Sequence, residues 1–161
     1  MTDSAKPAAE DTAAAKPASE DTPAAKPAAK DPAAAKPAAK PPAPEDQPFA
    51  TFVPNLLIPA LKQEISAYGG PSCEINLEQG PMPVVGSPCW MVVGQLPGER
   101  RFWLCFTQDA ISSAKTIALA ESGAEPSLLE SFLIDVKKTT LALLVSRLVQ
   151  RLNGQKWLGA N

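Results

Sequence analysis

Apolar residues between Glu45 and Tyr68 recur every three or four positions, which is the period of an amphipathic α-helix. Pro54 and Pro59 interrupt this segment, and each lacks the N–H that a helix uses. We therefore expect either two short helices or one helix that is kinked at Ile58-Pro59. Gly69-Gly70 follows the last apolar position and suits the positive φ at which helices end.

The middle of the chain has the patterns of β-strands. Residues 73–78 alternate between apolar and polar side chains, which indicates a strand with one buried and one solvated face. Residues 81–88 are rich in proline and are expected to form a loop. Residues 115–122 predict a short strand with Ile117 and Leu119 directed toward the core.

Residues 90–96 and 101–107 flank Pro97-Gly98 and predict a β-hairpin, because proline followed by glycine suits a tight turn. If the hairpin is symmetric about this turn, its two faces carry different side chains. One face then carries Met91, Val93, Phe102 and Leu104, and the other carries Trp90, Val92, Trp103 and Cys105. The second face is apolar where a two-layer fold exposes it to water, which makes it a candidate contact surface.

The last apolar segment predicts a long helix. Ser127 and Glu130 have the spacing of a capping box, and Asn153-Gly154 supplies a stop signal, so the helix would run from residue 127 to about residue 153. Its apolar positions form two stripes, whereas a surface helix needs one. We expect this helix to be buried on two sides, and a homodimer that covers the second stripe is an alternative.

These elements predict an α+β fold. A kinked N-terminal helix, an antiparallel sheet of three to four strands and a long C-terminal helix packed on the sheet would form a single domain over residues 45–161. Residues 1–44 differ, because they repeat Ala-Lys-Pro every ten residues and contain no large apolar residue after Met1. We expect them to form a disordered Ala/Lys/Pro decapeptide-repeat tail.

The charge balance argues against nucleic acid as a partner. The lysines of residues 1–44 are balanced by Asp and Glu, and the whole chain has a net charge of -2, whereas counterion release needs an excess of cations. Residues 1–44 fit neither a secretory signal nor a transit peptide. The apolar stretch Thr139 to Ser146 is too short to cross a bilayer. We expect a cytoplasmic protein with at most peripheral membrane association.

No catalytic, cofactor-binding or metal-binding residue is assigned from the sequence. The chain contains no histidine, which excludes a Ser-His-Asp mechanism, and it contains no Gly-rich phosphate loop. Cys73, Cys89 and Cys105 lack the paired spacing of zinc ligands and are expected to be small buried apolar residues. Glu74 and Glu78 could divide acid and base roles, but a solvated strand face explains them as well.

Aromatic and basic side chains form the predicted partner-binding surface. It joins the hairpin to the C-terminal end of the last helix, and its members are Trp90, Trp103, Arg147, Arg151, Lys156 and Trp157. Two structural alternatives stay open. The N-terminal helix could cover the tryptophans, and the basic residues could pair with the helix dipole.

Four motifs resemble those of a known family. They are Pro-Phe-x-x-Phe with Leu-x-Pro-Ala-Leu-Lys (Pro48 to Lys62), Pro-Val-Val-Gly-x-x-Cys-Trp (Pro83 to Trp90), Gly-Ala-x-Pro-Ser-x-Leu-Glu-x-Phe-Leu-Ile-Asp (Gly123 to Asp135) and Val-Gln-Arg-Leu-Asn-x-Gln-Lys-Trp-Leu (Val149 to Leu158). Residues 45–161 thus resemble a family of small proteins of cyanobacteria, with plastid relatives, that is known only as a domain of unknown function. The resemblance implies an auxiliary role near the thylakoid membrane and supplies no catalytic residues.

Three functions are compatible with these observations. The leading hypothesis is a non-enzymatic auxiliary or assembly protein that binds a photosynthetic complex such as photosystem II, through a photosystem subunit or a biogenesis factor, at the cytoplasmic face of the thylakoid membrane. The alternative is a carrier of a small apolar or pigment-like ligand in a cavity between the sheet and the long helix, lined by Trp90, Phe102, Phe106 and Leu144. The third is an uncharacterised enzyme that uses Glu74, Glu78 or Cys89.

Overall fold

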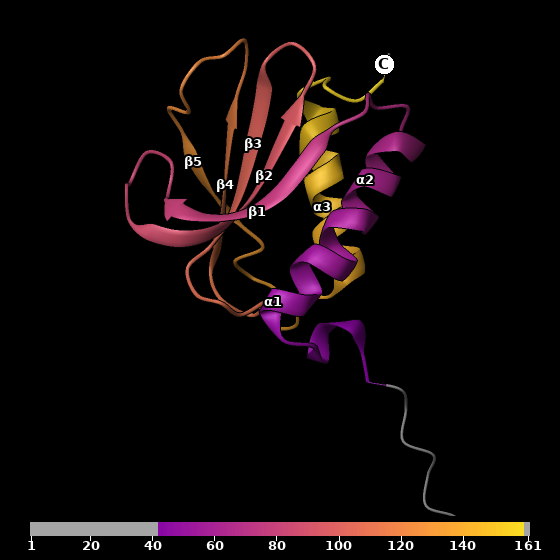
Figure 1. The fold of residues 1–161 in the computed structure, drawn as a ribbon, viewed down its shortest axis with the longest axis vertical. Helices are drawn as coiled ribbons and strands as arrows, with labels where there is room; N and C mark the ends of the chain where they lie inside the picture. Colours follow the sequence, from indigo (N-terminus) through magenta and orange to yellow (C-terminus); the bar gives the residue numbers. More distant parts are fainter. Residues whose placement is uncertain (1–41, 160–161) are drawn as a thin grey trace, which may run out of the picture. The chain divides into compact units, whose positions relative to one another are not determined.

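The computed structural model describes residues 42–159, which form an α+β domain (Figure 1). The predicted tail of residues 1–44 lies outside the described residues, apart from residues 42–44. The helical elements are the 3-10 turn η1 (Pro44–Asp46), α1 (Phe49–Phe52), the π-helical turn η2 (Val53–Leu57), α2 (Ile58–Ala67) and α3 (Leu141–Gly154). The strands are β1 (Glu74–Pro81), β2 (Pro88–Leu96), β3 (Arg100–Phe106), β4 (Lys115–Ala120) and β5 (Leu129–Phe132).

The N-terminal helix runs without a break through α1, η2 and α2, and the expectation of one kinked helix is confirmed. Its irregular turn lies at Val53–Leu57, however, and not at the predicted Ile58-Pro59. Pro54 and Pro59 each leave a carbonyl of the preceding turn without its usual donor. The chain accommodates this with the π-helical turn that contains Pro54, and such a turn is a known cause of helix bending. The buried stripe of this helix is complete despite the prolines, since Phe52, Leu57 and Leu61 are fully buried.

The five strands form one antiparallel sheet in the order β1-β2-β3-β4-β5, so each strand pairs with its neighbour in sequence. The prediction of an antiparallel sheet is confirmed, and the expected three to four strands become five. α2 and α3 lie together on one face of this sheet (Figure 1). This meander needs only short connections, which suits a domain of this size.

The extra strand, β5, occupies part of the sequence that was predicted to begin the last helix. α3 has 14 residues and begins after Thr140, whose hydroxyl accepts a hydrogen bond from the Leu143 N–H at 3.2 Å. The capping box predicted at Ser127 and Glu130 was wrong, because Glu130 lies in β5 and pairs in register with Ile117 of β4. A four-residue apolar pattern cannot distinguish a short strand from a helical turn, and pairing with β4 decides the outcome here.

The β2–β3 hairpin has a longer loop than a symmetric Pro97-Gly98 turn. Leu96 pairs with Arg100, so Pro97, Gly98 and Glu99 form the loop, and Gly98 and Glu99 have φ values of 82° and 55°. The additional loop residue shifts the register by one position, and such a shift exchanges the face of every partner residue. The predicted face assignment was therefore wrong. Trp90 shares a face with Val92, Phe102, Leu104 and Phe106, and Trp103 shares the opposite face with Met91, Val93 and Cys105.

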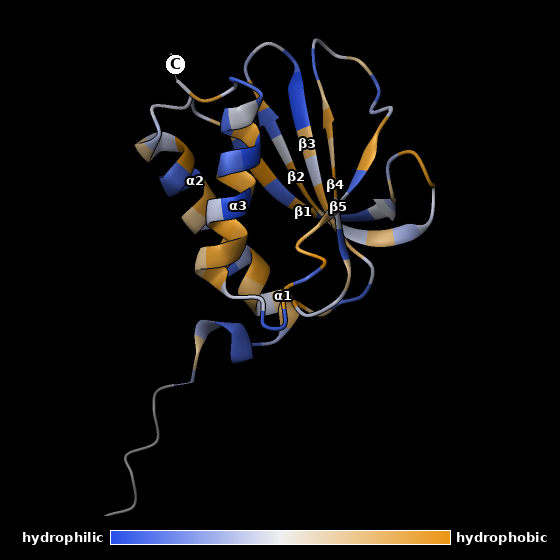
Figure 2. Ribbon diagram, turned by 180° about the vertical axis from the view of Figure 1, so that it is seen from behind, coloured by the Kyte–Doolittle hydropathy of each residue, from blue (hydrophilic) through white to orange (hydrophobic). Residues whose placement is uncertain are grey.

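Each face of the sheet has its own apolar cluster. The larger cluster lies between the sheet and the helices, whose apolar residues are orange in Figure 2, and it contains Phe102, Leu104, Ile117, Leu144 and Leu148. Ile117 and Leu119 belong to this side, as predicted. The smaller cluster lies on the other face and consists of Met82, Cys89, Met91, Trp103, Cys105, Ala118 and Ala120. The sheet is thus apolar on both faces, and the described helices cover one of them.

Candidate functional site

Trp90 is half-buried at the helix-covered face of the sheet, next to α1. The centroid of its ring lies 6.1 Å from that of Phe49, at an interplanar angle of 57°. The two rings line a surface cavity of about 340 Å³ together with Pro48, Ala50, Leu77 and Asp109. We call it the Trp90 cavity. Most of its wall is apolar, and Asp109 is its only acidic lining residue.

Trp103 lies on the opposite face of the sheet and is 9% exposed. The Arg101 guanidinium lies 5.1 Å from the centroid of its ring, which is a cation–π distance. Arg101 also lies 3.7 Å from a carboxylate oxygen of Glu125. The predicted surface that contains both Trp90 and Trp103 was therefore wrong. The N-terminal helix does not cover Trp103 either, and residues of the β1–β2 and β4–β5 loops lie beside it instead.

Arg151 and Trp157 tie the C-terminal end of α3 to the sheet. The Arg151 guanidinium donates two hydrogen bonds to Glu130 of β5, at 2.9 and 2.6 Å, and these bonds lower the pKa of the Glu130 carboxyl. Trp157 is 3% exposed, and its indole N–H donates to Glu121 Oε1 at 2.6 Å. Both side chains are already engaged within the domain.

Arg147 and Lys156 complete the predicted set of partner-binding residues, and both are exposed. Arg147 donates to Gln150 Oε1 at 3.0 Å within α3. Within residues 42–159, neither side chain has a carboxylate within 4.0 Å. Of the six residues predicted, Trp103 and Trp157 are buried, Arg151 is partly exposed but paired with Glu130, and Trp90, Arg147 and Lys156 have accessible atoms without a carboxylate partner among the described residues. The structure does not bring the six together on one surface.

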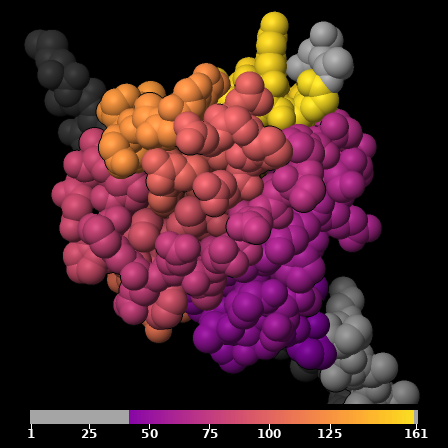
Figure 3. Space-filling view, turned by 45° about the horizontal axis from the view of Figure 1, so that its top comes forward, coloured from indigo at the N-terminus to yellow at the C-terminus, as the bar shows by residue number. Residues whose placement is uncertain are grey.

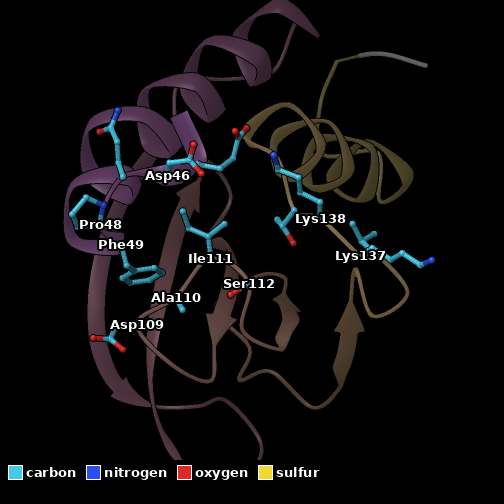
Figure 4. A pocket seen from close by; sticks show the side chains of 13 residues that line it. Asp46, Pro48, Phe49, Asp109, Ala110, Ile111, Ser112, Lys137 and Lys138 are labelled. Carbon is cyan, nitrogen blue, oxygen red and sulfur yellow. The ribbon is translucent and has the colours of Figure 1, made fainter. Parts of the chain in front are cut away.

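A larger cavity of about 440 Å³ lies beside the Trp90 cavity, where three connecting segments meet (Figure 4). Its lining includes acidic residues of the N-terminal segment and the basic pair Lys137 and Lys138. Figure 4 shows Lys138 extending toward the side that carries Asp46, whereas Lys137 points away from Phe49 and Ile111. Glu45 stabilises this end of the domain, because its Oε1 accepts a hydrogen bond from the Leu141 N–H at 2.8 Å.

Lys115 was missed by the sequence analysis. It begins β4, and its residue exposure is 4%. Its Nζ donates to the Ser113 carbonyl at 2.8 Å and to Thr139 Oγ1 at 3.2 Å, and burial lowers the pKa of the ammonium. The alternation that directs Ile117 inward places Lys115 on the same face, so this signal was present in the sequence.

The groups considered for catalysis lie apart from these cavities. Glu74 and Glu78 are exposed on β1, whereas Cys89 and Cys105 are buried in the smaller apolar cluster. Burial raises the pKa of the Cys89 thiol, and burial together with the neighbouring Cys89 raises the pKa of Cys105 to about 12. A thiol that stays protonated is a poor nucleophile. Within residues 42–159, no group of three or more His, Cys, Asp or Glu side chains is placed to hold a metal ion.

The residues proposed to surround a carried ligand are largely core residues. Phe102, Phe106 and Leu144 are fully buried and line none of the cavities described above, whereas Trp90 lines one. Three of the four residues expected to line a ligand cavity therefore do not support the carrier hypothesis.

Residues 43–159 match the family described as protein of unknown function DUF2996. The chain belongs to the DUF2996 family. The DUF2996 match covers nearly all the described residues, and it confirms the resemblance to a domain of unknown function. No curated protein matches the chain. Among the described residues of this DUF2996 domain, no helix is both long and apolar enough to span a membrane.

Proposed function

We propose that this chain is a non-enzymatic auxiliary or assembly protein that binds a photosynthetic membrane complex, with photosystem II as the leading candidate. Binding would occur at the cytoplasmic face of the thylakoid membrane. The structural observation that supports this proposal is the Trp90 cavity. The biological setting comes from the motif resemblance to a family of cyanobacteria and plastids.

The Trp90 cavity has the features of a site for an apolar side chain of a protein partner. Its volume of about 340 Å³ is near the lower end of the range for small-ligand sites, and its walls are mainly aromatic and aliphatic. Tryptophan is among the residues that contribute most to protein interfaces. The cavity also lies at the edge of the sheet, because Leu77 belongs to the edge strand β1.

The surface around this cavity is suited to contact with a larger protein. The N-terminal helix contacts β1, and Figure 3 shows the indigo N-terminal segment of the domain beside the magenta part of the surface. Ala50 is exposed at the cavity wall and contributes little bulk. A partner side chain could thus enter the cavity while its backbone approaches the helix.

A substitution at Ala50 tests the proposal without removing a core side chain. Ala50→Arg places a long cation in the cavity, and Ala67→Arg makes the same change at the exposed end of α2. We expect the full chain to retain photosystem subunits or their biogenesis factors from detergent-solubilised thylakoids. Ala50→Arg should reduce that recovery about tenfold, whereas Ala67→Arg should leave it unchanged.

Quantitative mass spectrometry of the retained proteins is the measurement, and crosslinking in native membranes identifies the subunit in contact. The proposal fails if the unmodified chain enriches no photosystem or biogenesis protein. The assignment of the Trp90 cavity as the binding site fails if both arginine variants retain these proteins equally. Circular dichroism of the variants shows whether each is folded.

A further inference from the structure

Lys115 is held in apolar surroundings at the helix-covered face of the sheet. Its register partners are Phe106 of β3 and Phe132 of β5, and both phenylalanines are buried. The Nζ lies 6.0 Å from the centroid of the Phe106 ring. The lysine stem thus packs as part of the core, and its ammonium group is at the margin of that core.

Among the described residues, the ammonium group has neutral hydrogen-bond acceptors and no anionic partner. Its two acceptors are the Ser113 carbonyl and Thr139 Oγ1, whereas an ammonium has three donors. Within residues 42–159, no carboxylate lies within 4.0 Å of its Nζ. Buried charges in proteins are normally paired, because the loss of hydration is otherwise not compensated. Within the described part of the chain, Lys115 is therefore a cation without an anionic partner and with one remaining donor.

This cation lines a cavity whose two sides differ in chemistry. The cavity has a volume of about 360 Å³ and shares no lining residue with the Trp90 cavity. Ser112, Ser113 and Thr139 provide polar groups near Lys115. The other side is formed by the apolar residues Phe132, Leu133, Ile134 and Val136.

The apolar side contains two unusual features. Leu133 has a φ of 56°, a conformation that is costly for a non-glycine residue. Ile134, the next residue, is 73% exposed, although a large aliphatic side chain gains free energy from burial. The chain therefore holds an aliphatic side chain at the rim of a cavity that has a cation at its base.

We propose that this cavity binds a small aliphatic carboxylic acid, with its carboxylate on Lys115 Nζ and its hydrocarbon chain against Leu133, Ile134 and Val136. The carboxylate supplies the missing negative charge and accepts the remaining ammonium donor. The hydrocarbon chain covers apolar surface that water otherwise contacts. No covalent step is involved.

The chemistry of the lining favours a carboxylate over a phosphate. A phosphate group carries more charge and is usually bound by several cations or by arginine in a bidentate arrangement. Lys115 is the only basic side chain among the residues that line this cavity. Lys137 and Lys138 line the neighbouring cavity instead.

Octanoate is a suitable probe, and the full chain is the protein to use. We expect isothermal titration calorimetry to show saturable binding of octanoate and binding of octanol that is at least about tenfold weaker. Lys115→Met keeps the length of the stem and removes the charge, so it should weaken octanoate binding about tenfold or more. Lys137→Met, which removes an exposed charge nearby, should leave the affinity unchanged.

A second measurement on the unmodified chain covers the case in which Lys115→Met does not fold. Amine labelling by acetic anhydride, read by peptide mass spectrometry, should be slowed by octanoate at Lys115 and not at Lys137. The proposal is overturned if octanoate does not bind saturably, or if octanol binds as well as octanoate. It is also overturned if folded Lys115→Met keeps the full affinity, or if octanoate does not slow labelling of Lys115.

Discussion

Gly94 of β2 lies directly against the ring of Phe102, its register partner on β3. A Cβ atom at residue 94 would overlap with that ring. Phe102 is fully buried and cannot move without displacing its neighbours in the larger apolar cluster. The absence of a side chain at this position is therefore a packing requirement.

Gly94→Ala is expected to destabilise the domain by about 1–3 kcal/mol, because overpacking a filled core forces side chains or backbone to shift. Urea unfolding followed by tryptophan fluorescence measures the change. Gly154→Ala is the matched control, since an added Cβ there has no neighbour within 4 Å. We expect the control to remain within about 0.5 kcal/mol of the parent chain. Equal unfolding midpoints for the two variants would contradict this prediction.

At the scale of the elements, β5 and α3 depend on each other. β5 has only four residues and pairs with β4 alone, so it is an edge strand with few backbone hydrogen bonds. The side chains of Glu130 and Arg151 add two hydrogen bonds between this strand and the helix. The ion pair that they form is about one-third exposed, so its contribution to stability is modest.

Glu130→Gln is expected to lower the free energy of unfolding by about 0.5–1 kcal/mol at neutral pH. The hydrogen bonds from Arg151 lower the pKa of Glu130 below 4.5, so the pair stabilises the folded state above that pH. This contribution disappears as the pH falls through the lowered pKa. Thermal melts at a series of pH values should therefore show the variant and the parent chain converging in acid.

Glu125→Gln is the control for this experiment, because Glu125 forms an ion pair with Arg101 but has 89% of its side chain exposed. It should leave the melting temperature unchanged at every pH. A difference between Glu130→Gln and the parent chain that persists undiminished in acid would show that the charge of Glu130 is not its source.

At the scale of the whole molecule, the residues of both apolar clusters lie between Phe49 and Leu158. The helix-covered cluster joins the N-terminal helix, the sheet and α3, so these parts are expected to unfold together. Apart from Met1, the sequence of residues 1–41 contains no large apolar side chain.

Deletion of residues 1–41 is therefore expected to change the melting temperature by no more than a few degrees. The physical reason is that the large apolar residues that drive folding all lie in the remaining chain. Differential scanning calorimetry of the full and the shortened chain measures the effect. A larger loss of melting temperature would show that the repeat segment contributes to the fold.

The sequence by itself determined the elements that depend on local pattern. Helical spacing identified the N-terminal helix, alternation identified β1 and β4, and Asn153-Gly154 marked the end of α3. These features arise from neighbours in the chain, and short-range periodicity records them well. The prolines also predicted that this helix is kinked, because a missing N–H affects its own helix, although the π-helical turn surrounds Pro54 and not Ile58-Pro59.

Only the tertiary structure decided which surfaces these elements form. One additional residue in the β2–β3 loop placed Trp90 and Trp103 on opposite faces of the sheet. Residues 129–132 form a strand because they pair with β4. The same packing enclosed Lys115 between segments that are distant in sequence. Strand pairing and the enclosure of a charge depend on partners far along the chain, so local pattern does not determine them.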